Sequence, residues 1–175
     1  MNLCQSEYLE KLLHNVTSAK SAAPLKTSEF AAQFPASQSD EAHLREAMET
    51  IAGIQNAIYI VRLEHQEVRD VKKIKQLMID YKSKQERSCP KVNRDVSTVM
   101  YVGSSSTGLT KRLNQHFGFG YPKTYALQLQ YWFRGRVSIE VLDYANTSRE
   151  VLQLVEDAIS AQLKPMFGKQ GSNNK

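Results

Sequence analysis

Residues 98–117 predict a β-strand, a tight turn and a short helix in direct succession. The first part, Val99-Met-Tyr-Val102, is mostly β-branched and aromatic, as strands are, and Gly103 after it permits a sharp turn. The helix is indicated by apolar residues at every fourth position, namely Leu109, Leu113 and Phe117. The chain is therefore expected to contain a strand whose end leads directly into an amphipathic helix.

Three polar side chains of this stretch are expected to converge near the start of the helix. Tyr101 lies at the end of the strand, and Arg112 and His116, four residues apart, share a helix face other than the apolar one. Ser104 and Ser105 can hydrogen-bond to exposed N–H groups where the helix begins. A phenol, a guanidinium and an imidazole in one place suit an anionic ligand.

The length of 175 residues favours one domain, or one domain with an appendage, and 41% hydrophobic residues are enough for a core. No apolar run approaches the roughly 18–20 residues that cross a bilayer, so no membrane association is expected. No basic segment followed by an apolar stretch opens the sequence, so no signal peptide is expected. Cys4 and Cys89 lie far apart, which argues against a disulfide framework or a zinc site and favours a cytoplasmic location.

The net charge of +5 is distributed unevenly along the chain. Residues 1–50 hold four basic and seven acidic side chains, residues 62–94 hold ten and five, and residues 95–175 hold nine and six. The positive charge therefore belongs to the middle and C-terminal parts, and it suits the phosphate backbone of a nucleic acid. A basic surface that only faces solvent is the more ordinary explanation, and charge alone favours it.

Residues 1–53 are predicted to form an acidic, helical N-terminal appendage. One helix is expected over residues 6–20 and a second from about Asp40 to Gly53, with a segment rich in Ser, Ala and Pro between them. No catalytic chemistry is apparent in this part of the sequence.

Two further strands are predicted after the appendage. Ala57–Leu63 is short, apolar and β-branched, and it carries Tyr59, although a tyrosine in a strand is usually a core residue. Val137–Asp143 alternates between apolar and polar residues. Helices are expected over residues 66–88, over residues 124–133 and between residues 147 and 165. The predicted fold class is α+β, with a small three-stranded, mainly antiparallel sheet flanked by helices in a sandwich-like arrangement.

The helix predicted over residues 66–88 is strongly basic. Its basic residues are Lys72, Lys73, Lys75, Lys82, Lys84 and Arg87. Such a helix can follow the phosphates of a nucleic acid. It can equally be an ordinary amphipathic helix that covers the sheet and keeps its lysines in water.

Glu156 is an exception in the apolar pattern of the last helix, because it lies at the edge of the predicted buried stripe, between Leu152 and Ile159. A carboxylate there is costly unless a cation or a metal ion pairs with it. Asp157 is expected further round the helix, toward solvent. A glutamate that reaches out to solvent or pairs with a lysine explains the pattern as well.

Taken together, these residues resemble the GIY-YIG nuclease family. Ala57-Ile-Tyr59 stands at the family's first signature tripeptide, with alanine for glycine, and Tyr101-Val-Gly103 stands at the second, with valine for isoleucine. The family's arginine matches Arg112, its common histidine one turn later matches His116, and its metal-binding glutamate matches Glu156. All of these positions occur in the family's order, each on the expected strand or helix.

The resemblance implies a nuclease domain at residues 54–171 that is followed by a polar tail at 172–175. The basic helix and loop at residues 65–96 are an insertion between the two tripeptides, which a short loop joins in compact family members. Family members that act as restriction enzymes tolerate large insertions there and use them to grip DNA.

The family usually has an asparagine soon after the last helix, and this chain has Gly168 at the best-matching position. Gln170, Asn173 and Asn174 are candidate replacements for that asparagine.

The implied chemistry is hydrolysis of a phosphodiester by water. Tyr59 is the first candidate for the base or water-orienting group, with Tyr101 beside it and His116 as a rival. A tyrosine base needs its pKa, ordinarily near ~10, depressed by neighbours such as Arg112. Arg112 would bind the scissile phosphate in its forked geometry, and Glu156 would hold one Mg²⁺ or Mn²⁺.

The partner implied by the resemblance is DNA, expected to be double-stranded, and the sequence is compatible with a homodimer. Residues expected to contact the nucleic acid are Lys72, Lys73, Lys75, Lys82, Lys84, Arg87, Lys111, Ser104 and Ser105. A restriction or other defence enzyme and a mobile-element nuclease are the biological roles considered.

Two other classes stay open. The first is a nucleic-acid-binding module that kept the fold but lost cleavage, which Ala57 and Gly168 favour slightly. The second is a structural protein whose basic face is merely solvated.

Overall fold

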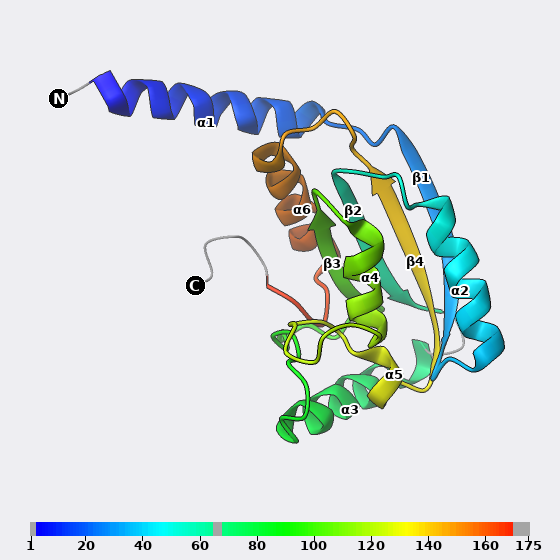
Figure 1. Cartoon of the computed structure of the whole chain (residues 1–175). Coiled ribbons are helices and arrows are strands. Elements are labelled where there is room, and N and C mark those ends of the chain that lie inside the picture. The colour runs from blue at the N-terminus through cyan, green and yellow to red at the C-terminus, as the bar shows by residue number, and fades with distance from the viewer. Residues whose placement is uncertain (1–2, 65–67, 170–175) are drawn as a thin grey trace.

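A four-stranded antiparallel sheet forms the centre of the computed structural model, which describes residues 3–64 and 68–169 (Figure 1). The strands are β1 (Lys26–Phe34), β2 (Ala57–Leu63), β3 (Val99–Ser105) and β4 (Gly135–Asp143), in the spatial order β1-β4-β2-β3. All three pairings are antiparallel. The predicted α+β class is confirmed, whereas the predicted number of three strands is wrong.

The strand that the sequence failed to reveal is β1. It pairs with β4 along its whole length, from Lys26 opposite Asp143 to Phe34 opposite Gly135. Only Ala32 and Phe34 are buried in it. An edge strand with few buried side chains gives a weak pattern, and its Lys, Glu and Ala residues are depleted in strands. Residues 1–53 are therefore helical only in part.

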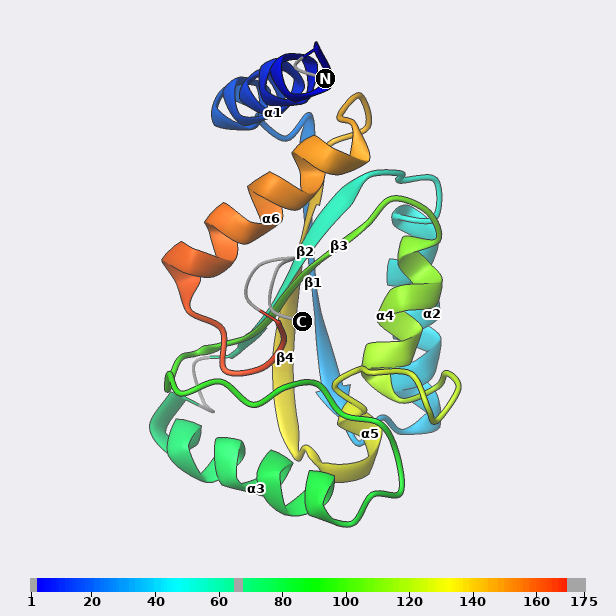
Figure 2. The ribbon, with the colours of Figure 1, turned by 90° about the vertical axis from the view of Figure 1, so that its left-hand side faces the viewer.

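Helices cover both faces of the sheet, as Figure 2 shows. One face carries α2 (Gln38–Thr50), α4 (Leu109–Phe117) and the one-turn α5 (Leu129–Trp132), with α3 (Val71–Ser83) across one end. The other face carries α6 (Arg149–Leu163). The C-terminal end of α1 (Leu3–Ser21) packs against α6. The core therefore has two parts, one on each side of the sheet. Tyr59 belongs to the first part, and its neighbours in β2, Ile58 and Ile60, belong to the second.

The observed helices match the predicted ones at four places and differ at two. The helices expected at residues 6–20, from Asp40, after Gly103 and after Ser148 are present as α1, α2, α4 and α6. The basic helix is shorter than predicted, because a 3₁₀ turn occupies 68–70 and α3 ends at Ser83. The helix expected over residues 124–133 is reduced to α5, because Gln128 has a left-handed backbone with φ 57°.

Helix α1 extends away from the rest of the molecule (Figure 1). Its exposed apolar residues are Tyr8, Leu9, Leu12, Leu13 and Val16. No helix within residues 3–64 and 68–169 is both long and apolar enough to cross a membrane.

Candidate functional site

Tyr59 and Tyr101 lie on the same face of the neighbouring strands β2 and β3. The antiparallel register places Tyr59 opposite Gly103 and Tyr101 opposite Val61. The two phenol rings stack, with 6.1 Å between centroids and 11° between planes. A Cβ atom at Gly103 would lie 2.5 Å from the Tyr59 oxygen, so only glycine at this position lets the phenols meet.

Helix α4 supplies Arg112 to these phenols. Its apolar stripe, Leu109, Leu113 and Phe117, is buried as predicted. Arg112 donates from Nε to the Tyr59 oxygen at 3.2 Å and from Nη2 to the Tyr101 oxygen at 3.3 Å. It also donates from Nη1 to Gln115 Oε1 and from Nη2 to the Tyr125 carbonyl, each at 3.0 Å. A guanidinium has five N–H donors, so one remains for a ligand and the predicted two-pronged grip on a phosphate would require an exchange of partners.

His116, one turn further on α4, is fully buried behind Tyr59. The Leu127 N–H donates to its Nδ1 at 3.2 Å, so we infer that Nδ1 carries no proton. Nε2 then carries the ring proton and donates to the Tyr59 oxygen at 3.0 Å. Burial, together with Arg112, lowers the pKa of His116 well below its usual value. A neutral ring with both nitrogens engaged positions Tyr59, and it is poorly suited to the role of rival base.

The pKa shifts of the two phenols are opposite to the predicted one. Burial raises the pKa of Tyr59, and the attraction of Arg112 only partly offsets this effect. The pKa of Tyr101 is raised for the same reason. The expected depression is wrong because the phenols lose more hydration than one cation restores. Both are therefore neutral hydroxyl groups at neutral pH, suited to orienting water rather than to removing its proton unaided.

Glu156 approaches from α6, on the opposite side of the sheet. The hydroxyl of Ser104, on β3, donates to Glu156 Oε2, and Gln153 Nε2 donates to the same oxygen at 3.3 Å. Burial raises the pKa of Glu156, the Ser104 hydrogen bond lowers it, and the charge of Asp157 raises it. The carboxylate is thus held in one orientation although its surroundings disfavour its charge.

One cavity of about 260 Å³ brings four of the five predicted catalytic residues together. They are Tyr59, Tyr101, Arg112 and Glu156, and His116 stands directly behind Tyr59. The cavity lies beside β3, the last strand of the sheet, where the α4 side and the α6 side of the molecule meet.

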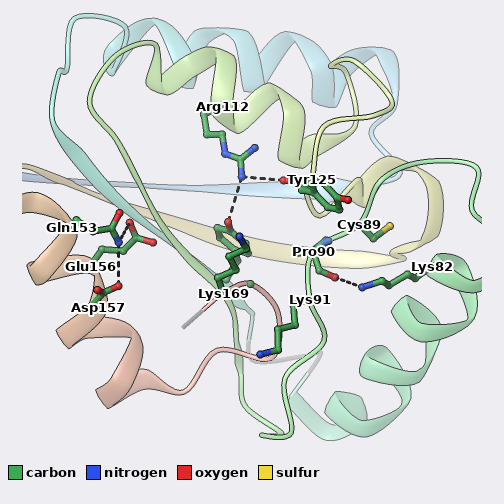
Figure 3. A pocket seen from close by; sticks show the side chains of 12 residues that line it. Lys82, Cys89, Pro90, Lys91, Arg112, Tyr125, Gln153, Glu156, Asp157 and Lys169 are labelled. Carbon is green, nitrogen blue, oxygen red and sulfur yellow. Dashed lines mark hydrogen bonds between the residues drawn. The ribbon is translucent and has the colours of Figure 1, made fainter. Parts of the chain in front are cut away.

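A larger cavity of about 660 Å³ shares four residues with the first one, namely Tyr101, Arg112, Gln153 and Glu156 (Figure 3). Its further lining includes Lys82, Lys91, Tyr125, Asp157 and Lys169. Asp157 was expected toward solvent, but it is half-buried and accepts a hydrogen bond from Gln153 at 3.1 Å. The sequence could have revealed the role of Gln153, because this residue lies three positions before Glu156 and four before Asp157, which places all three on one helix face.

The oxygen donors of this site fit a hard divalent cation. Within the described part of the chain, no group of three or more His, Cys, Asp and Glu side chains could hold a metal ion. Mg²⁺ is often bound by one or two carboxylates while water and substrate phosphate complete its shell. Glu156, oriented by Ser104 and Gln153 and close to Asp157, meets this requirement.

The residues predicted to contact nucleic acid fall into two groups. Lys72, Lys73, Lys84 and Lys111 are exposed. Lys75 instead donates to the carbonyls of Arg94 and Asp95, and Lys82 donates to the carbonyl of Pro90.

Arg87 is a structural clamp. It donates to Gln128, to the Tyr131 hydroxyl and to the carbonyls of Gly118 and Gly120, and its guanidinium lies 4.3 Å from the Tyr131 ring centroid. These contacts leave it little capacity for a phosphate, contrary to the expectation.

The remaining expectations concern the serines and the C-terminal segment. Ser104 lines the smaller cavity, where its hydroxyl holds Glu156. Ser105 is buried and donates to the Thr107 carbonyl, so its side chain is not presented to a nucleic acid. Gly168 packs against the ring of Tyr101. The candidate replacements for the family's asparagine, Gln170, Asn173 and Asn174, lie outside the described residues.

Comparison of the chain with family models, with curated proteins and with solved structures finds no match.

Proposed function

We propose that the chain is a metal-dependent endonuclease that hydrolyses phosphodiester bonds of DNA in the manner of GIY-YIG nucleases. The observation that carries the proposal is the single cavity lined by Tyr59, Tyr101, Arg112 and Glu156. These side chains come from two strands and two helices on opposite faces of the sheet. Core packing alone does not require two phenols, a guanidinium and a carboxylate to line the same space.

Each side chain has a role that its contacts support. The remaining N–H of Arg112 neutralises a phosphate oxygen that gains charge in the transition state. The hydroxyls of Tyr59 and Tyr101, whose rings stack, orient the attacking water. The hydrogen bond from His116 Nε2 holds the Tyr59 hydroxyl in place. Glu156 would hold one Mg²⁺ or Mn²⁺, which supplies a Lewis acid for the phosphate and lowers the pKa of bound water.

The proposal is tested by incubating supercoiled plasmid with the purified chain in Mg²⁺ or Mn²⁺. The unchanged chain is expected to nick or cut the plasmid, and Glu156→Gln and Arg112→Gln are expected to lower the rate by at least ~10²-fold. Glu150→Gln is the matched control, because Glu150 is an exposed glutamate in the first turn of the same helix. Cleavage that survives Glu156→Gln would contradict the proposal.

A second candidate is a nucleic-acid-binding module without cleavage, favoured by Gly168 at the position of the family's asparagine. It predicts salt-sensitive binding of DNA with no cleavage in either metal ion. A structural protein with a solvated basic face predicts neither binding nor cleavage. Sequencing of the product ends would show whether cleavage is sequence-specific, as a restriction role requires.

A further inference from the structure

The larger cavity beside the candidate site combines an aromatic ring with three lysine side chains. Its volume of about 660 Å³ is within the range of pockets that enclose nucleotide-sized ligands. Lys82, Lys91 and Lys169 line it together with Tyr125, whose residue surface is 71% exposed (Figure 3). A flat ring among positive charges is suited to a ligand that carries both a planar base and phosphates.

The backbone of Tyr125 is fixed to the catalytic residues while its ring is not. Its carbonyl accepts the Arg112 Nη2 hydrogen bond at 3.0 Å. Two residues later, the Leu127 N–H is bound by His116, and both Ala126 and Leu127 are fully buried. The main chain of Tyr125 is therefore held next to the Arg112 guanidinium, whereas the exposed ring is free to contact a ligand.

The other exposed aromatic residues between positions 118 and 132 have different surroundings. Tyr131 is covered by Arg87 and stacks on Tyr81, with 6.4 Å between ring centroids. Phe119 lines a separate groove between α2 and α4. Tyr121 is 67% exposed and is not part of the cavity lining. Within the described residues, Tyr125 is the exposed ring that lines the cavity of the candidate site.

We propose that Tyr125 stacks on an unpaired nucleobase next to the scissile phosphate, so that the substrate is a nucleic acid with unpaired nucleotides at the cleavage point. This inference rests on the proposed function and proposes a single-stranded or locally opened substrate in place of the expected regular duplex. In a duplex, neighbouring bases cover both faces of each base. A ring can therefore stack on a base only where the base has left the stack.

The test measures binding of a fluorescein-labelled single strand and of the corresponding duplex to the whole chain, without divalent cations. Tyr125→Ala keeps the carbonyl that Arg112 uses and removes only the ring. It is expected to weaken single-strand binding about ten-fold or more, and Tyr125→Phe is expected to restore it. Tyr121→Ala, which removes an equally exposed tyrosine of the same loop, is expected to bind like the unchanged chain.

A second readout places 2-aminopurine in the strand and follows its fluorescence, which stacking quenches. Quenching by the unchanged chain and its loss in Tyr125→Ala supports the inference. Normal single-strand binding by Tyr125→Ala, with intact cleavage of duplex plasmid, overturns the inference and leaves the proposed nuclease function standing. Absence of binding and of cleavage for every nucleic acid overturns both.

Discussion

The Tyr59 oxygen accepts hydrogen bonds from two donors, Arg112 Nε and His116 Nε2. Arg112 also donates from Nη2 to the Tyr101 oxygen, so its guanidinium bridges the two phenols. Hydrogen bonds thus connect buried His116 through Tyr59 and Arg112 to Tyr101. Tyr101, the last residue of this series, lines both cavities.

The neutral state of His116 predicts a pH-dependent stability. The pKa of His116 is lowered in the fold, whereas the unfolded chain protonates its histidines near ~6.5. The unfolded state therefore binds more protons at low pH. The stability that this residue contributes is complete above about pH 6.5 and is lost below it, by up to ~1.4 kcal/mol per pH unit.

Urea unfolding between pH 8 and pH 5 measures this effect. His116→Gln, which keeps a polar buried side chain, is expected to flatten the decrease toward pH 5. His43→Gln, at an exposed position, serves as the control and should leave the slope as it is in the unchanged chain. An equal slope for the unchanged chain and His116→Gln would show that His116 is not the titrating group.

The raised pKa of Glu156 predicts that replacing this carboxylate stabilises the fold, although the same replacement is expected to lower cleavage. Because the fold raises the pKa of this carboxyl, the native state retains the proton at pH values where the unfolded chain has lost it. Stability therefore falls as the pH rises from the unfolded pKa, near ~4.3, to the folded one. Glu156→Gln removes this loss and can still accept the Ser104 hydrogen bond.

The expected result at pH 7.5 is a melting temperature roughly 2–4 °C above that of the unchanged chain, which corresponds to about 1 kcal/mol in a chain of this length. Below the pKa that Glu156 has in the unfolded chain, the two melting temperatures should be equal. Scanning calorimetry at pH 7.5 and at pH 4 measures both values. A variant that is less stable at pH 7.5 would show that the buried charge is compensated by contacts that the amide cannot make.

At the scale of elements, the site depends on the close pairing of β2 and β3. Gly103 lies opposite Tyr59, and an added methyl group would lie 2.7 Å from the Tyr101 ring. Gly103→Ala is therefore expected to destabilise the fold by ~1–3 kcal/mol and to lower plasmid cleavage by about 10²-fold, because both phenols must move. Gly53→Ala is the control, since a methyl group there meets no atom within 4 Å.

Urea unfolding and plasmid nicking rates of the two variants provide the comparison. Equal behaviour of Gly103→Ala and Gly53→Ala would mean that the phenols tolerate displacement and that their stacking is not needed for cleavage.

Most elements that carry the site were predictable from the sequence, because their apolar periodicity is strong. The spacing of Arg112 and His116 already indicated a shared helix face. The hydrogen-bond state of His116 was not predictable, because it depends on the Leu127 N–H in a loop whose path is set by the Arg87 clamp and by the left-handed Gln128. The raised pKa values of the phenols depend on burial, which no local pattern of residues records.

Gly168, which follows α6, is a second position whose explanation could not be predicted from the sequence. The resemblance marks this position as one where an asparagine is missing. The structure shows a backbone with φ 112° and a Cβ position 2.9 Å from the Tyr101 ring, so an asparagine would not fit without displacing that phenol. The glycine follows from the close packing of the C-terminal segment on Tyr101, which only the folded chain reveals.

For the whole molecule, the position of the site follows from the order of the strands. Since β3 is at the edge of the sheet, the helices on the two faces can approach each other past it without another strand between them. Arg112 and Glu156, which belong to opposite faces, can then line one cavity. The segment between β2 and β3 contributes Lys82 and Lys91 to the adjoining larger cavity and so brings positive charge to the site.

This arrangement predicts that lysines near the cavity and lysines far from it affect binding and cleavage differently. Lys91 and Lys169 line the larger cavity, whereas Lys72 and Lys73 lie at the start of α3, outside it. Removing either pair by substitution with alanine is expected to reduce the slope of log K against log salt by about 1.5, because two phosphate contacts are lost. Only Lys91→Ala with Lys169→Ala is expected to slow cleavage at saturating DNA, because these two lysines line the same cavity as Arg112 and Glu156. Binding titrations from 50 to 200 mM salt and single-turnover cleavage measure the two effects.

An unchanged salt slope for Lys72→Ala with Lys73→Ala would show that α3 is not part of the nucleic-acid interface. An unchanged salt slope for Lys91→Ala with Lys169→Ala would show that the larger cavity is not part of that interface.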